Sequence, residues 1–147
     1  MTARLMILNG PNLNLLGVRE PHIYGSTTLA AIKASCEELA KSTGARLSFH
    51  QSNHEGALVD KLHEVIDSAA GALINPAGLT QHGVSLHDAI KGAGNLPLVE
   101  IHISNVHQRE AFRHHSYISP AAAGIVVGFG TDGYRIALLG LARKAGL

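Results

Sequence analysis

The segment Leu5-Met6-Ile7-Leu8-Asn9-Gly10-Pro11 decides the fold. Four consecutive apolar residues are typical of a parallel strand that is buried on both faces. Asn-Gly-Pro is typical of the turn that ends such a strand. We therefore predict that this segment is the first strand of a parallel sheet.

The rest of the chain alternates between helix and strand patterns. After Thr28, a predicted N-cap, apolar residues recur every three or four positions until Gly44. Helical spacing returns in three further segments, at 58–69, at about 84–90 and at 137–146. Strands are predicted at 47–49, 72–74, 98–102 and 125–127. Five strands that alternate with helices predict a doubly wound, parallel α/β sheet.

Composition and charge exclude several classes of protein function. The 147 residues, 46% of them hydrophobic, suit one globular domain over 1–147. A net charge of +1 argues against nucleic-acid and membrane-surface binding, because both need a dense basic face. No apolar run approaches the roughly 18 residues of a membrane span, and the first residues do not resemble a signal peptide. We expect a cytoplasmic protein whose partner is a small molecule.

Polar residues follow three of the predicted strands. They are Asn9, Asn12 and Asn14 after the first strand, Asn75, Thr80 and Gln81 after the third, and His102, Ser104 and Asn105 after the fourth. In open α/β sheets, ligands bind beyond the carboxyl ends of the strands. A loop asparagine is often only a turn former. Three polar sets at one edge nevertheless indicate a binding site.

His102 ends a strand that is predicted to be buried. A histidine at such a place is more often a satisfied core residue than a catalyst. Glu100 lies two residues earlier and therefore faces the same side of the strand. Its carboxylate could orient the imidazole for general acid catalysis near neutral pH. From spacing alone both interpretations of His102 stay open, and Arg19, Glu20 and Tyr24 read as solvated charges with one packed aromatic ring.

Other motifs exclude several chemistries. Gly128–Gly133 matches G-x-G-x-x-G, but the further strand with an acid about 20 residues later does not follow it. Cys36 is the single cysteine and lies on an apolar helical stripe, which favours core packing and excludes an internal disulfide. The ten histidines show no H-E-x-x-H spacing, so we expect no metal. No G-x-S-x-G elbow is present, which leaves acid/base chemistry.

The segment Asn9–Gly17, followed by Arg19-Glu20-Pro21 and Tyr24-Gly25, resembles the type II 3-dehydroquinases. The resemblance recurs at Glu100–His107 and from Arg109 to Gly128. It implies a flavodoxin-like fold, a doubly wound five-stranded parallel sheet with helices on both faces. It also implies a lyase that dehydrates 3-dehydroquinate to 3-dehydroshikimate by anti elimination through an enolate, without a metal or organic cofactor.

The resemblance assigns roles to individual residues. Tyr24 is the implied general base, with Arg19 as its partner in a mobile lid loop at about 17–26, and His102 is the implied acid. A free tyrosine has a pKa of about 10, and a nearby arginine favours its anion. The other implied catalytic residues are Asn12, which holds the enolate, and Arg109, which tunes the tyrosine. Glu100 joins the predicted catalytic residues because it lies two residues before His102 on the same face of the strand. The implied substrate-binding residues are Asn75, Gln81, Asp88, Ile103, Ser104 and Arg113.

One segment departs from the family pattern. Gln81 stands where the family usually has a substrate-contacting His, His82 where Thr is usual, and His87 where Arg is usual before Asp88. One extra residue also lies between Asp88 and His102. Gln81 can still donate a neutral hydrogen bond, so drift within the same activity is favoured. The rival hypothesis is a divergent subfamily that acts on a related cyclic hydroxy-ketone acid.

Two hypotheses without this activity share the same sheet. A non-enzymatic flavodoxin-like module would bind FMN or act as a receiver domain, but a receiver needs acidic residues where this chain has asparagines after its first and third strands. A homologue without activity is disfavoured by Arg19, Tyr24 and His102. The resemblance also implies a homo-oligomer, typically a dodecamer of trimers. The reaction serves both aromatic amino-acid synthesis through shikimate and quinate breakdown, so both pathways stay open.

Overall fold

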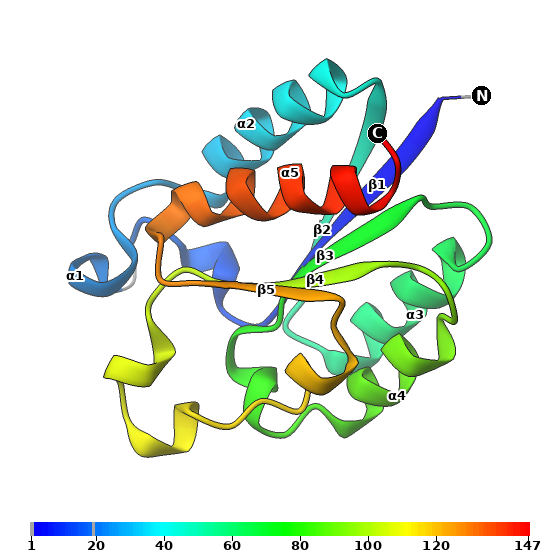
Figure 1. Ribbon diagram of the computed structural model, residues 1–147. Helices are drawn as coiled ribbons and strands as arrows, with labels where there is room; N and C mark the ends of the chain where they lie inside the picture. Colours follow the sequence, from blue (N-terminus) through cyan, green and yellow to red (C-terminus); the bar gives the residue numbers. More distant parts are fainter. Residues whose placement is uncertain (1, 19) are drawn as a thin grey trace.

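Five parallel strands form one sheet in the order β2-β1-β3-β4-β5 (Figure 1). The computed structural model describes residues 2–18 and 20–147, excluding the side chain of Tyr24. The strands are β1 (Ala3–Asn9), β2 (Ala45–Gln51), β3 (Gly71–Asn75), β4 (Leu98–His102) and β5 (Gly124–Val127). The strand order reverses at β1, which places a ligand crevice at the carboxyl ends of β1 and β3. The predicted doubly wound parallel sheet is confirmed.

Four of the helices in the described chain cover the two faces of the sheet (Figure 1). They are α2 (Leu29–Ser42) and α5 (Gly133–Lys144) on one face, and α3 (Glu55–Val65) and α4 (Val84–Gly92) on the other. The hydroxyl of Thr28 accepts a hydrogen bond from the Ala31 amide at 3.2 Å, as predicted for the N-cap of α2. Gly44, at φ 81°, follows the end of this helix.

The side chains of β1 divide between two apolar cores. Leu5 and Ile7 join the core beneath α2 and α5, whereas Met6 and Leu8 join the core beneath α3 and α4. All four are fully buried, and the alternation follows from the strand period of two. Each buried side chain of this size contributes about 1.5–3 kcal/mol. The prediction that β1 is buried on both faces is confirmed.

Three details differ from the sequence prediction. Helix α3 ends at Val65 instead of continuing to residue 69, because the chain turns there to enter β3. The loop at 17–26 contains the short helix α1 (Pro21–Tyr24), which begins after Glu20 at φ 45°. The segment 103–123 holds three 3₁₀ helices, η3 (Val106–Gln108), η4 (Ala111–Arg113) and η5 (Ser119–Ala121). Such short helices have no apolar periodicity from which they could be predicted.

The glycines of the G-x-G-x-x-G segment serve backbone geometry. Gly128 has φ 92°, and a Cβ on it would lie 3.2 Å from Asn105 Cβ. Gly133 begins α5, and a Cβ there would lie 3.2 Å from Ile101 Cδ1. The motif therefore makes a turn and lets α5 approach the sheet closely. Cys36 is fully buried, as predicted, and no helix within 2–18 and 20–147 is long and apolar enough to span a membrane.

Gly10, which follows β1, lies in close contact with the end of β3. Its amide donates to the Asn75 carbonyl at 2.8 Å, and a Cβ on Gly10 would overlap the Pro76 carbonyl. We predict that Gly10→Ala lowers the free energy of unfolding by about 1–3 kcal/mol. Gly56→Ala in α3 is the matched control, because a Cβ there meets nothing within 4 Å and alanine favours helix. Urea unfolding measures both, and equal stability of the two variants would contradict the prediction.

Candidate active site

A cavity of about 140 Å³ lies at the carboxyl ends of β1, β3 and β4. Its wall is made by the loop after β1, by the 3₁₀ helix η2 (Ala77–Gln81), by the end of β4 and by the segment after it. This is the edge at which the sequence predicted a site. The predicted site residues that line the cavity are Asn12, Asn75, Gln81, His102, Ile103, Ser104, Arg109 and Arg113.

Of the other four predicted site residues, two lie outside the described wall of the cavity and two are not described by the structure. Glu100 is fully buried behind His102. Asp88 lies exposed on α4 and outside the described wall of the cavity. Arg19 lies outside the described residues, and so does the side chain of Tyr24, whose backbone ends α1. The structure therefore brings eight of the twelve predicted residues together around one cavity.

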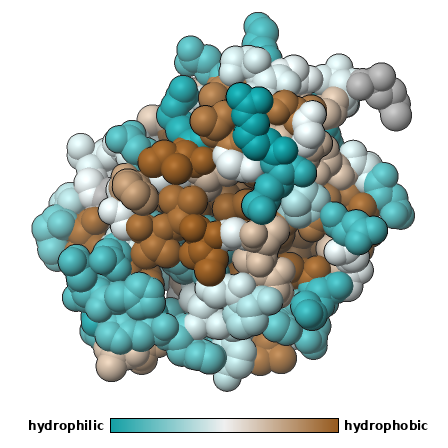
Figure 2. Space-filling view, viewed as in Figure 1, coloured by the Kyte–Doolittle hydropathy of each residue, from teal (hydrophilic) through white to brown (hydrophobic). Residues whose placement is uncertain are grey.

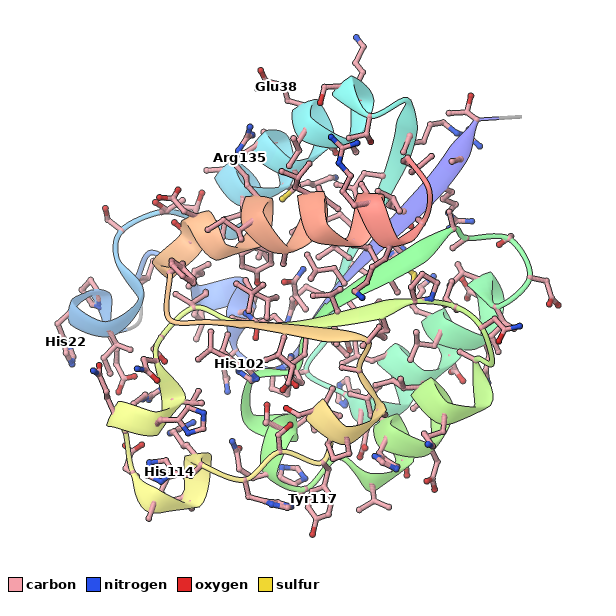
Figure 3. The ribbon with its side chains drawn as sticks, in the orientation of Figure 1. His22, Glu38, His102, His114, Tyr117 and Arg135 are labelled. Atoms are coloured by element: carbon pink, nitrogen blue, oxygen red, sulfur yellow. The ribbon has the colours of Figure 1, made fainter. Side chains whose placement is uncertain are left out.

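His102 and Glu100 form a buried pair at the end of β4. Figure 3 shows His102 near the carboxyl end of this strand, with His114 and Tyr117 on the segment that follows. The His102 Nε2 lies 2.6 Å from Glu100 Oε2. The hydroxyls of Ser116 and Ser119 also donate to this carboxylate, one to each oxygen. Three donors thus surround a carboxylate that has no exposed surface.

The Glu100 carboxylate is ionised at neutral pH. Burial alone raises its pKa, but the hydrogen bonds from His102, Ser119 and Ser116 and the charge of His102 outweigh burial and leave the pKa below its ordinary value. An ionised carboxylate accepts hydrogen bonds and donates none. The proton on His102 is therefore held on Nε2, and Nδ1 is the nitrogen that can exchange a proton with a ligand.

Two guanidinium groups give the cavity a positive wall. The Arg113 Nε donates to Glu110 Oε2 at 2.7 Å, and the Arg109 Nε lies 3.9 Å from the same oxygen. Arg109 also donates to the Ser104 hydroxyl at 3.3 Å. Arg113 further lies over the Phe112 ring, 5.0 Å from its centroid. Held this way, the two cations suit the recognition of a carboxylate ligand.

The backbone is strained where it forms the cavity wall. Asn12 has φ 69° and Ala77 has φ 50°, and both residues line the cavity. Positive φ is uncommon for residues other than glycine and persists where the surrounding structure enforces it. The backbone amide of Asn12 donates to Asn53 Oδ1 at 3.0 Å, which fixes the turn after β1. Sequence reasoning missed Asn53, because its loop follows β2 and carries no motif.

Ser116 and Ser119 were also missed by the sequence analysis. The Ser116 hydroxyl accepts from the amides of Ile118 and Ser119 at 3.0 Å each and donates to Glu100 at 3.0 Å. The signal that could have revealed them is the buried Glu100 itself, because a buried charge requires donors from elsewhere in the chain. Of the departures from the family pattern, Gln81 lines the cavity, whereas His87 donates from Nδ1 to the Tyr117 carbonyl at 2.6 Å.

The lowered pKa of Glu100 makes stability depend on pH. Because the folded pKa lies below the unfolded one, the carboxylate stabilises the fold fully above the ordinary value of about 4.3, and this stabilisation is lost as the pH falls through the folded pKa. We predict that the free energy of unfolding falls more steeply as the pH drops below about 5 in the wild type than in Glu100→Gln. Urea titrations at each pH measure this. Parallel pH curves for the two proteins would contradict it.

Comparison with known proteins identifies the family. The family model described as dehydroquinase class II matches residues 3–142. A 3-dehydroquinate dehydratase of Marinomonas sp. (strain MWYL1) is 57% identical over 95% of this chain and 96% of its own length. A catabolic 3-dehydroquinase 1 of Aspergillus fumigatus is 52% identical over 94% of this chain and 91% of its own. The crystal structure of the type II dehydroquinase from Butyrivibrio crossotus superposes with a TM-score of 0.93 at 38% identity, covering 95% of this chain and 97% of that one. The chain belongs to the type II dehydroquinase family.

Proposed function

We propose that this protein dehydrates 3-dehydroquinate to 3-dehydroshikimate by acid/base catalysis, without a cofactor. The buried Glu100–His102 pair beside a cavity with two arginines is the observation that supports this most strongly. In the proposed reaction a base removes a proton α to the ketone, which gives an enolate. The enolate then expels a hydroxyl group that takes up a proton. One C–H and one C–O bond break, one C=C bond forms, and water leaves.

His102 is the proposed acid. Its Nδ1 would protonate the departing hydroxyl while Nε2 stays bound to Glu100, so the ring remains oriented through the proton transfer. The carboxylate also stabilises the ring whenever it is charged, as the aspartate does in the catalytic triads of serine proteases. Glu100 is therefore a positioning residue that acts through His102.

Tyr24 is the proposed base and Arg19 its partner, as the family resemblance implies. Helix α1 ends at Tyr24 and lies in the loop that follows η1 (Leu13–Leu15). Leu13 of η1 lines the cavity. Gly17 at φ 91° and Gly25 at φ 78° flank this segment, and their conformations suit a lid that hinges at both ends. Arg109 would then stabilise the phenolate and Asn12 the enolate oxygen.

The remaining cavity residues are proposed to bind the substrate. Arg113, aided by Ser104 and the Ile103 backbone, would hold the substrate carboxylate, since a guanidinium matches a carboxylate in charge and shape. Gln81 and Asn75 would donate to the hydroxyl groups. Gln81 stands where the family usually has His, and its side-chain amide keeps a hydrogen-bond donor in the cavity wall. The substitution is therefore compatible with the same substrate.

We also propose that the protein is a homo-oligomer, a dodecamer that is assembled from trimers. An apolar patch supports this: β5 is an edge strand, and Ile125 on it and Phe129 after it are 50% and 61% exposed. Figure 2 shows apolar side chains gathered over β5 and continuing onto α5, where Ile136 and Leu139 are exposed. The resemblance implies that Asp88 binds substrate, and we propose that this residue, exposed on α4, contacts a ligand bound to another copy of the chain. The cytoplasmic location stays a prediction, which cell fractionation tests.

The assigned acid and base can be tested by substitution. We predict that Tyr24→Phe and His102→Ala each lower kcat at least about a hundredfold, since general acid/base groups contribute roughly 10² to 10⁴. The rate is measured from the ultraviolet absorbance of the conjugated enone product. Tyr117→Phe and His63→Ala are matched controls, because both residues are exposed and lie outside the described cavity wall. Turnover within about tenfold of the wild type in Tyr24→Phe or His102→Ala would refute that role.

The oligomer can be tested by mass. Light scattering after gel filtration should give about twelve times the chain mass of 15.5 kDa. Ile125→Asp should shift the protein to smaller species, because it places a charge in the exposed apolar patch. Glu38→Ala on the exposed surface of α2 is the control and should leave the mass unchanged. A 15.5 kDa monomer in the wild type would contradict the proposal.

A further inference from the structure

A chain of buried hydrogen bonds connects β1, α5 and β3 behind the cavity. The Tyr134 hydroxyl donates to Asn9 Oδ1 at 2.6 Å and accepts from Asn75 Nδ2 at 2.9 Å. Tyr134 and Asn9 have no exposed surface, and Asn75 is 3% exposed where it lines the cavity. Residues far apart in the sequence thus meet in one polar network inside an apolar core.

Backbone groups at the two ends set the direction of every hydrogen bond in this chain. The Ala77 amide can only donate, so the atom of Asn75 that lies 3.2 Å from it must be the oxygen. The Asn75 nitrogen therefore faces Tyr134, whose own proton must go to Asn9 Oδ1. The nitrogen of Asn9 then donates to the His50 carbonyl at 3.0 Å, a group that can only accept. The assignment is consistent from one end to the other.

Tyr134 is suited to remain a neutral link in this chain. Burial raises the pKa of its hydroxyl above the ordinary value, while the hydrogen bond from Asn75 lowers it by less. A neutral phenol accepts one hydrogen bond and donates another. An ionised one would lose the bond to Asn9.

Asn75 keeps one further hydrogen-bonding group. A side-chain amide nitrogen carries two hydrogens, of which one is used by Tyr134. Because the amide is planar and its oxygen is held by Ala77, the second hydrogen has a fixed direction. A flipped amide would present its nitrogen to the Ala77 N–H, donor against donor, and would leave buried groups unsatisfied.

We propose that Tyr134 is a positioning residue that holds the Asn75 amide with one N–H directed at the ligand. The inference rests on the proposed function, because it takes the ligand to be a cyclic hydroxy acid whose oxygens accept hydrogen bonds. The positive φ of Ala77 fits this role, since the strained turn brings the Ala77 amide to the Asn75 oxygen. Tyr134 itself lies outside the described cavity wall and acts through Asn75.

A double-mutant cycle tests the proposal. Tyr134→Phe removes one oxygen and keeps the ring in the core, and Asn75→Ser removes the amide. We expect Tyr134→Phe to raise KM for 3-dehydroquinate about 3- to 10-fold, the range for one hydrogen bond, with kcat changed less than about twofold. In the Asn75→Ser background the same change should have no further effect on KM, because Tyr134 acts through Asn75.

The control variant is Leu138→Ala, which opens the same core one turn along α5 without touching a polar group. It should lower thermal stability and leave KM unchanged. The same cycle is measured on the Kd of quinate, a cyclic hydroxy acid, by calorimetry. The Kd of quinate can show the expected non-additive effect of Tyr134→Phe and Asn75→Ser even if the wild type does not turn over 3-dehydroquinate. That result would refute the proposed function and keep this inference. The inference would be overturned by additive effects of Tyr134→Phe and Asn75→Ser, or by an unchanged KM in Tyr134→Phe. An equal rise of KM in Leu138→Ala, or no binding of either ligand, would also overturn it.

Discussion

The burial of one ionised carboxylate, Glu100, is the constraint on which the site depends. A charge removed from water is tolerated when it is paired and hydrogen-bonded. Glu100 lies on a central strand between two apolar cores, so its donors must come from the chain nearby. His102 is one donor, and Ser116 and Ser119 are the others. These contacts bring the segment after β4 back over the strand ends.

That returning segment carries most of the positive wall of the cavity. Arg109 and Arg113 lie on it, held by Glu110, and Ser104 begins it. The cavity is also lined by Asn12 and Asn75, which are fixed by strained backbone and by the hydrogen bonds of Asn53 and Tyr134. Asn75 and His102, which both line the cavity, are held by the fully buried Tyr134 and Glu100. Such preorganisation is what stabilises a developing charge without rearrangement during the reaction.

Much of this could be predicted from the sequence, for identifiable reasons. The apolar run Leu5–Leu8 and the helical spacing after Thr28 predicted the sheet and its layers, since burial imposes their periods directly. The polar residues after β1, β3 and β4 predicted the site, because parallel strands end at one edge. The family resemblance, which the family match confirms, implied the role of general acid for His102, a role that spacing alone had left open.

Other features depended on contacts that no local pattern records. Ser116, Ser119 and Tyr134 act on residues distant in the sequence, and the 3₁₀ helices after β4 lack a period. Asp88 looked like a site residue in the sequence, yet it lies on the exposed face of α4. In the proposed oligomer such a residue would gain a ligand contact through assembly, which sequence periodicity does not encode.

The most direct test of cofactor-free dehydration is a single kinetic trace. Purified protein, dialysed against a chelator, is mixed with 3-dehydroquinate, and the ultraviolet absorbance of the conjugated enone is followed. Acid/base catalysis by the chain's own residues predicts a rise in absorbance at a rate that added divalent cations do not change. No rise in absorbance, or a rise that requires an added metal, would contradict it.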